Sequence, residues 1–151
     1  MSFNVLAEIY ATKQQYPDCP MWALSWNYRK NNLLREIRQF NGDIISLQEV
    51  QADRFEDFFL PEMRKLGYEG LYKKKTRESM GREGKVDGCA LFYRTSSLKL
   101  LEKYVIEFNE AAMAMAHAGT LSNKRSASPD ELQKGLQRVL RDNIAQVVVL
   151  R

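Results

Sequence analysis

The chain has 151 residues, of which 44% are hydrophobic and 28% are charged, so we expect one folded domain rather than a disordered chain. No apolar run approaches the roughly 20 residues that cross a bilayer, and no secretion signal precedes the first strand, so neither a membrane protein nor a secreted one is expected. Two cysteines and a single histidine are too few for a disulfide framework or a zinc site. We therefore expect reduced thiols in a cytoplasmic protein, with the nucleus as a second location.

Positive charge is concentrated in one segment. Residues 73–85 hold six basic and two acidic residues, a net charge of +4, which equals the net charge of the whole chain. A basic loop of this kind can bind phosphates by releasing their counterions. The alternative is a solvated surface loop without a ligand, which is the commoner role of such segments.

The first elements alternate between strand and helix. A strand is predicted at residues 3–6, and a helix follows from Pro20, which suits a first helical turn. Gly42 is placed to end this helix. Its apolar residues recur at helical spacing: Trp22, Trp26, Leu33, Ile37 and Phe40. A short apolar strand then spans residues 43–48, with Glu49 at its exit.

A second apolar stripe predicts another helix after that strand. Its members are Phe55, Phe58, Phe59, Met63 and Leu66. Pro61 is expected to divide the helix into two pieces, and Gly67 is expected to end it. A brief strand is predicted at residues 68–72.

The later elements are mainly strands. Residues 86–94 are typical of a buried central strand, and the alternation at 103–108 predicts a half-exposed strand. Residues 109–128 are predicted to be a loop, with a short helix at its start as an option. A short helix from Pro129 to Leu140 and a strand over 142–150 complete the order.

The last strand is the most apolar one, and the chain ends directly after it. Val147–Leu150 needs neighbours on both faces, yet no turn or partner strand follows before Arg151. The order of strands and helices is that of an α/β fold. We therefore expect residues 1–151 to be the N-terminal part of a domain that is incomplete, cut within or after strand 142–150.

Two polar residues stand where phosphoester chemistry would need them. Glu49 directly follows an apolar strand, so its carboxylate is expected at the rim of a sheet, where oxygen ligands can hold a hard cation. Asn4 lies between apolar residues of the first strand, and a parallel strand–helix–strand unit would bring the two side chains together. The alternatives are a first-turn helix acid for Glu49 and a hydrogen-bonded buried amide for Asn4.

Other candidates have plain structural alternatives. Asp87 would either orient a ligand or simply begin a strand. His117 lies in a stretch rich in Ala and Met and is interpreted as a bystander. Trp22, Trp26 and Tyr28 have rings that can stack on bases, although aromatic residues at helical spacing are more often core.

Three segments resemble, in order, the motifs of one superfamily. Phe3–Ala7 is similar to the opening motif of the endonuclease/exonuclease/phosphatase superfamily, Ile45–Val50 to its second motif, and Asp87–Phe92 to a later strand. Three further segments, 10–29, 104–113 and 138–145, resemble deadenylases of the carbon catabolite repressor protein 4 type. Residues 114–135 match no motif.

The resemblance implies a four-layered α/β sandwich of the DNase I type. It implies that Glu49 is the main magnesium ligand and that Asn4 supports the metal or the phosphate, so Mg²⁺ is the expected cofactor. Poly(A) RNA is the implied substrate, and other subunits of a Ccr4–Not type complex are the implied partners. The D-x-N motif, the second aspartate and the C-terminal histidine of the family are not matched in this chain.

The hypothesis that follows is part of a 3′-to-5′ exoribonuclease that shortens mRNA poly(A) tails and releases 5′-AMP, with the chain alone inactive. One alternative is an inactive half-domain that acts as a binding or regulatory module. Another is a phosphodiesterase or phosphatase of the same fold with a different substrate.

Overall fold

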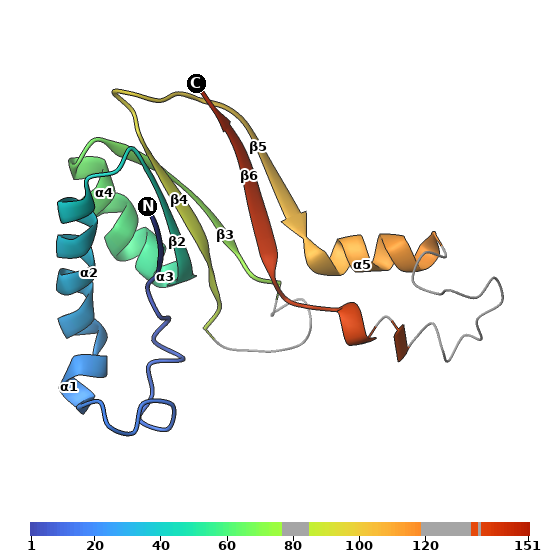
Figure 1. The fold of residues 1–151 in the computed structure, drawn as a ribbon, viewed down its shortest axis with the longest axis horizontal. Coiled ribbons are helices and arrows are strands. Elements are labelled where there is room, and N and C mark those ends of the chain that lie inside the picture. The colour runs from blue at the N-terminus through green and yellow to red at the C-terminus, as the bar shows by residue number, and fades with distance from the viewer. Residues whose placement is uncertain (77–84, 119–133, 136) are drawn as a thin grey trace.

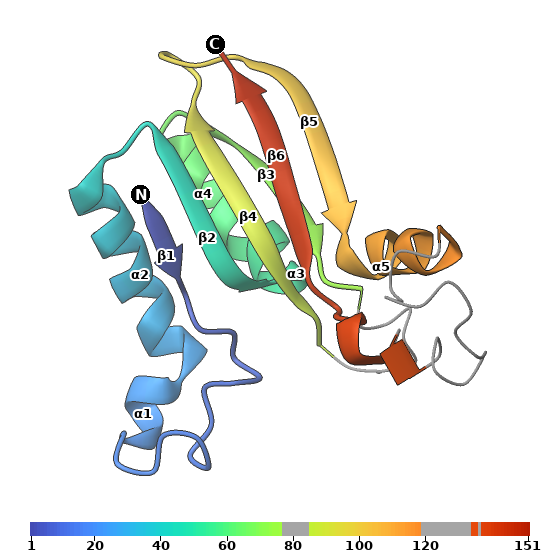
Figure 2. The same cartoon turned by 45° about the vertical axis from the view of Figure 1, so that its right-hand side comes forward.

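The computed structural model describes residues 1–76, 85–118, 134–135 and 137–151. These residues form three layers: helices, a four-stranded sheet and a two-stranded sheet (Figure 1, Figure 2). The α/β class predicted from the sequence is confirmed. Within the described part of the chain, no helix has the length and apolar character needed to span a membrane.

The four-stranded sheet fixes where the candidate site lies. Its strands are β1 (Ser2–Asn4), β2 (Ile44–Gln51), β4 (Asp87–Arg94) and β3 (Tyr68–Lys74), in that spatial order. β1 runs parallel to β2, and the other two pairings are antiparallel. The predicted central strand is confirmed, because β4 pairs on both sides. Since β1 and β2 are parallel, the residues that follow their C-terminal ends emerge at the same edge of the sheet.

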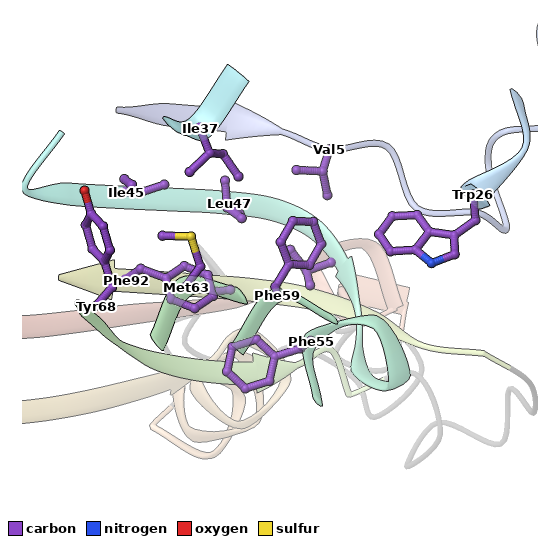
Figure 3. Close-up of a cluster of buried hydrophobic side chains, with 12 residues drawn as sticks. Val5, Trp26, Ile37, Ile45, Leu47, Phe55, Phe59, Met63, Tyr68 and Phe92 are labelled. Carbon is purple, nitrogen blue, oxygen red and sulfur yellow. The ribbon is translucent and has the colours of Figure 1, made fainter. Parts of the chain in front are cut away.

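Alternation along the central strands separates a core face from an opposite face. Ile45 and Leu47 of β2 and Phe92 of β4 are fully buried and pack against the helical layer through Phe59 and Met63 (Figure 3). Burial of each such side chain contributes about 1.5–3 kcal/mol. The core therefore lies between the helices and one face of the sheet.

The predicted first helix is two helices, α1 (Met21–Leu24) and α2 (Trp26–Phe40). Ser25 between them has a ψ of 134°, which is an extended conformation and breaks the helical register. Trp22 is therefore turned away from the buried face and is 61% exposed. The prediction that the five apolar residues lie on one helix was therefore wrong for Trp22, which belongs to α1, while the other four belong to α2.

The end of α2 also differs from the prediction. Asn41, with a left-handed φ of 47°, caps the helix one residue before Gly42. Phe40, the last helical residue, is 66% exposed. The buried face of α2 is made by Trp26, Leu34 and Ile37.

The second helical region has three pieces rather than the predicted two, and none of its junctions lies at Pro61. It consists of α3 (Ala52–Arg54), the π-helical turn η1 (Phe55–Phe59) and α4 (Leu60–Lys65). Pro61 stands in the first turn of α4, where its missing N–H is tolerated. Gly67, with a left-handed φ of 82°, follows the end of the region.

A second sheet covers the other face of the first. β5 (Leu100–Glu107) and β6 (Ile144–Leu150) are antiparallel. Gln146 of β6 donates its Nε2 to the carbonyl of Cys89 in β4 at 2.7 Å. The side of β5 and β6 that faces away from β4 is exposed, so β5 is more open than the predicted half-exposed strand. The exposed apolar residues on that side are Tyr104 and Ile106 of β5 and Val147 and Val149 of β6, which are 41% to 55% exposed.

The segment between β5 and β6 begins with a helix. α5 (Phe108–His117) confirms the short helix that was an option at the start of the predicted loop. Residues 134–135 and 137–139 are helical, in agreement with the end of the predicted helix. Its predicted start at Pro129 lies outside the described residues.

Gly88 stands where no side chain fits. A Cβ there would lie 2.2 Å from the carbonyl oxygen of Lys73 and 2.7 Å from the Cα of Lys74. Because both are backbone atoms of the paired strand, β3 and β4 would have to move apart. We predict that Gly88→Ala lowers the free energy of unfolding in urea by about 3 kcal/mol. A Cβ at Gly135 would meet no atom of the described residues within 4 Å, so Gly135→Ala should not destabilise the protein, and equal losses at both sites would contradict the prediction.

Candidate metal-binding site

Glu49 occupies a β-bulge. The pairing of β2 with β4 shifts between Gln48 and Val50, so Glu49 is the extra residue, with a left-handed φ of 59°. Strict alternation after the buried Leu47 would direct the carboxylate into the core. The bulge instead returns Val50 to the core, where it is 1% exposed, and leaves Glu49 at the rim. The sequence placed Glu49 at the exit of the strand, whereas the strand continues to Gln51 and the bulge turns the carboxylate out of it.

Asn4 and Glu49 meet beside the ends of two parallel strands. Asn4 is aligned with Gln48, and its Nδ2 donates to Glu49 Oε1 at 2.7 Å. Asn4 Oδ1 accepts the N–H of Leu6 at 2.8 Å, and the N–H of Ala7 donates to Glu49 Oε2 at 3.2 Å. The predicted convergence of the two side chains is confirmed, and both carboxylate oxygens are held in place.

Backbone strain is concentrated at this point. Leu6 has a φ of 55° and Glu49 a φ of 59°, so two non-glycine residues adopt the left-handed conformation beside each other. Each costs about 1–2 kcal/mol relative to an ordinary conformation. Strain of this kind persists only where surrounding interactions over-determine the backbone, and it is frequent at functional sites.

A charged pair borders the site. Glu8 accepts a hydrogen bond from Arg54 at 2.8 Å, which lowers the pKa of the Glu8 carboxyl and raises the pKa of the Arg54 guanidinium. Arg54 also lies over the ring of Trp26, 5.3 Å from its centre. These three residues line a cavity of about 470 Å³ next to the site. This pair was not predicted from the sequence, because its members are 46 residues apart.

Glu49 and Asn4 fit a hard cation, although they supply only part of its ligands. Each carboxylate oxygen accepts one hydrogen bond from the protein and keeps a further lone pair. In residues 1–76, 85–118, 134–135 and 137–151, no group of three or more His, Cys, Asp or Glu side chains forms a metal cluster. Mg²⁺ commonly binds one or two carboxylates and takes its other ligands from water and phosphate. The donor set is therefore suitable for a metal shared with a phosphorylated substrate.

Asp87 belongs to a buried cluster of its own. Its carboxylate is 0% exposed, accepts the hydroxyl of Tyr10 at 3.1 Å and pairs with the Lys75 ammonium at 2.9 Å. Burial is the largest influence on the Lys75 ammonium and would by itself lower its pKa, but the hydrogen bond to Asp87 and the attraction of the Asp87 charge together raise the pKa. Of the two interpretations, the structure supports the strand start, because Asp87 opens β4 and fastens Tyr10 to the sheet.

The basic segment is not one free loop. Lys73 and Lys74 belong to β3, and Lys73 forms an ion pair with Glu107. Lys75 is engaged with Asp87. The prediction of a basic loop over 73–85 was therefore wrong for its first part, where lysines neutralise acidic groups of the protein itself. Residues 77–84 lie outside the described residues.

The aromatic candidates divide into core and surface. Trp26 is 9% exposed and packs against Phe58 and Phe59, so the core interpretation is right for it. Trp22 and Tyr28 are 61% and 47% exposed and form an edge-to-face pair with ring centres 4.9 Å apart. His117 is the last residue of α5.

Comparisons with known proteins point to one family. A model described as the Endonuclease/Exonuclease/phosphatase family matches residues 1–147. The chain is 46% identical over 152 residues to carbon catabolite repressor protein 4 homolog 1 of Arabidopsis thaliana, covering 99% of this chain and 24% of that protein. It is 41% identical to the CCR4-Not complex 3′-5′-exoribonuclease subunit Ccr4 of Candida glabrata, covering 100% of this chain and 16% of that protein. The chain thus spans a quarter or less of the length of these curated relatives.

Solved structures share the fold. A structure of ANGEL2, a 2′,3′-cyclic phosphatase, superposes with a TM-score of 0.72 at 29% identity, covering 99% of this chain and 35% of that one. The catalytic domain of human Nocturnin gives a TM-score of 0.52 at 32% identity, covering 68% of this chain and 34% of that one. The described residues therefore have the fold of one part of these domains.

The strain at Glu49 can be measured with two substitutions. Glu49→Gly and Glu49→Ala both remove the carboxylate, but only alanine keeps a Cβ at a φ of 59°. We predict that Glu49→Gly is more stable than Glu49→Ala by about 1 kcal/mol in urea unfolding, because the left-handed penalty exceeds the entropic cost of glycine. The same pair at Gln48, within the paired part of the strand, is the control, and there alanine should be the more stable. If alanine is also the more stable of the two substitutions at position 49, the backbone at Glu49 is not strained.

Proposed function

This chain belongs to the endonuclease/exonuclease/phosphatase family, and we propose that it is part of a magnesium-dependent 3′-to-5′ exoribonuclease that shortens mRNA poly(A) tails and releases 5′-AMP. Nucleases of this family are metal-dependent hydrolases. The name of the Candida glabrata relative supports the exoribonuclease activity and the direction of cleavage. Poly(A) as the substrate and Mg²⁺ as the metal are more specific than these comparisons, and we propose both.

One observation carries the proposal. The carboxylate of Glu49 is held at the end of two parallel strands, with one oxygen on Asn4 and the other on the Ala7 N–H. Both residues lie in the segments that resemble the motifs of the family. A carboxylate fixed in this way keeps lone pairs directed away from the protein, toward a cation.

The roles of the two residues follow from their hydrogen bonds. Glu49 would hold the metal, which when bound would polarise a phosphate oxygen. Asn4 fixes the orientation of the Glu49 carboxylate through its Nδ2, and its Oδ1 keeps a lone pair for the metal or its water. The group that prepares the attacking water is not identified among the described residues.

Partners and location belong to the same proposal. The names of relatives from Xenopus laevis and Candida glabrata place those proteins in CCR4-NOT complexes, and we propose that this protein also acts with subunits of such a complex on poly(A) RNA. A cytoplasmic location, with the nucleus as a second one, is compatible with the free thiols of Cys19 and Cys89.

A second candidate function is a phosphatase or phosphodiesterase of the same fold. The likeness to ANGEL2, described as a 2′,3′-cyclic phosphatase, covers 99% of the chain and favours it. The Asn4–Glu49 pair suits either reaction, because both act on phosphoesters. Comparing an oligoadenylate with a free 3′ hydroxyl and one with a 2′,3′-cyclic phosphate distinguishes them. An inactive binding module would bind RNA and process neither.

Glu49→Gln in the full-length protein tests the metal assignment. The amide keeps the size of the side chain but loses the negative charge that a divalent cation requires. We predict a loss of at least about a hundredfold in trimming of labelled poly(A) by a protein that remains folded. Glu56→Gln, at an exposed position of η1, is the matched control and should keep full activity. Near-normal trimming by the Glu49 variant would overturn the assignment.

The 151-residue chain by itself is predicted to be inactive. Its described residues offer Glu49 and Asn4 to a metal but no cluster of three ligand side chains, and catalysis also needs a prepared water. The exposed apolar face of β5 and β6 is expected to make the isolated chain associate with itself. Incubation with poly(A) and Mg²⁺, together with light scattering, tests both points. Release of 5′-AMP that disappears on Glu49→Gln would contradict the prediction.

A further inference from the structure

The turn that follows β1 is held from the helical layer by one side chain. Arg29 of α2 donates its Nη1 to the carbonyl oxygens of Val5 at 2.9 Å and Leu6 at 2.7 Å. Its Nε donates to the carbonyl oxygen of Leu24, the last residue of α1, at 3.0 Å. One guanidinium therefore fastens the turn to the junction of α1 and α2.

The two carbonyls of the turn belong to peptide units whose N–H groups face the candidate site. The Val5 carbonyl shares a planar peptide unit with the Leu6 N–H, which donates to Asn4 Oδ1. The Leu6 carbonyl shares one with the Ala7 N–H, which donates to Glu49 Oε2. Because each unit is rigid, holding its oxygen also fixes the direction of its N–H.

Arg29 and the site therefore clamp the same two peptide units from opposite ends. The oxygens are bound by one positively charged group, and the N–H groups are bound by Asn4 and Glu49. Hydrogen bonds in such a chain polarise one another, so a cation on the oxygen strengthens donation by the N–H. These hydrogen bonds also account for the left-handed φ of Leu6, because a leucine without such restraints would adopt an ordinary conformation.

Burial of the Arg29 guanidinium has an energetic cost. Its Nη2 is buried and has no hydrogen-bond partner among the described residues. Burial also lowers the pKa of its guanidinium. Arginine nevertheless suits the position, because its planar fork reaches the Leu24 carbonyl and the turn at once, which the single ammonium of lysine does not.

We propose that Arg29 is a positioning residue for Glu49: it holds peptide units 5–6 and 6–7 so that their N–H groups fix Asn4 and the Glu49 carboxylate in the geometry that binds a divalent cation. This inference rests on the proposed function, since it takes Glu49 as a metal ligand. Arg29 acts on Asn4 and Glu49 through these two peptide units.

The test measures metal binding directly in the full-length protein. Mn²⁺, which replaces Mg²⁺ and is detected by electron paramagnetic resonance, is titrated into the parent protein and into Arg29→Lys. We expect about tenfold weaker Mn²⁺ binding, the usual effect of removing a group that orients a metal ligand. Arg38→Lys is the matched control, because Arg38 lies on the same helix in an exposed ion pair with Glu62 at 3.4 Å. Its affinity for Mn²⁺ should equal that of the parent.

A rescue experiment separates positioning from general stability. Arg29→Ala leaves space for a guanidinium ion, so added guanidinium at millimolar concentration should restore Mn²⁺ binding, whereas added ammonium should not. Thermal unfolding is followed in parallel. Mn²⁺ affinity in Arg29→Lys within twofold of the parent overturns the proposal. So does a loss of affinity that only follows loss of the folded protein and that guanidinium does not reverse.

Glu49→Gln distinguishes this failure from failure of the proposed function. If Glu49→Gln loses Mn²⁺ binding and Arg29→Lys keeps it, only the positioning role is wrong. If Glu49→Gln binds Mn²⁺ as the parent does, the metal assignment itself is wrong, and the role of Arg29 falls with it.

Discussion

The site depends on how the Glu49 carboxylate points out of β2 although core residues lie on both sides of it along the strand. Leu47 and Val50 both belong to the core, yet they are an odd number of residues apart. Only an extra residue between them satisfies both, and the bulge makes Glu49 that residue. The same irregularity that preserves the core thus places a charged group at the rim of the sheet.

The segment after β1 is then fastened from two sides. On one side it is joined to α2 and to Glu49 through its backbone. On the other side the Tyr10 hydroxyl donates to the buried carboxylate of Asp87, which Lys75 neutralises. Buried ion pairs contribute little net stability, because desolvation offsets their attraction. The value of this pair is therefore in fixing the path of the segment at the edge that carries the site.

Two acidic residues at one edge of the sheet thus have opposite roles. Asp87 is enclosed, accepts the Tyr10 hydroxyl and is matched by the Lys75 ammonium. Glu49 is held by neutral donors and keeps its charge available. A carboxylate without a cation of its own attracts a metal, whereas one that already has a lysine does not. Substrate choice is a separate matter, because the same fold and the same pair serve different phosphoester reactions.

The sequence alone determined the local parts of this structure. Apolar runs located β2 and β4, the alternation at 103–108 located β5, and the resemblance to the family motifs singled out Asn4 and Glu49. These features depend on nearest-neighbour sterics, on the period of the strand and on residue types at fixed spacing, all of which can be read along the chain. The bulge was not predicted, because it arises from the register between two strands about 40 residues apart.

The tertiary structure decided which charged and aromatic side chains find partners within the protein and which stay exposed. Lys73 and Lys75 looked like a free basic loop, but distant acidic partners engage them. Trp22 looked like core, but an extended Ser25 turns it outward. Arg29 lies within the predicted first helix, and only the fold brings the turn after β1 against it. A charged side chain pairs with the group that the fold brings within about 3 Å of it. Such distances between residues far apart in the chain cannot be read from a single sequence.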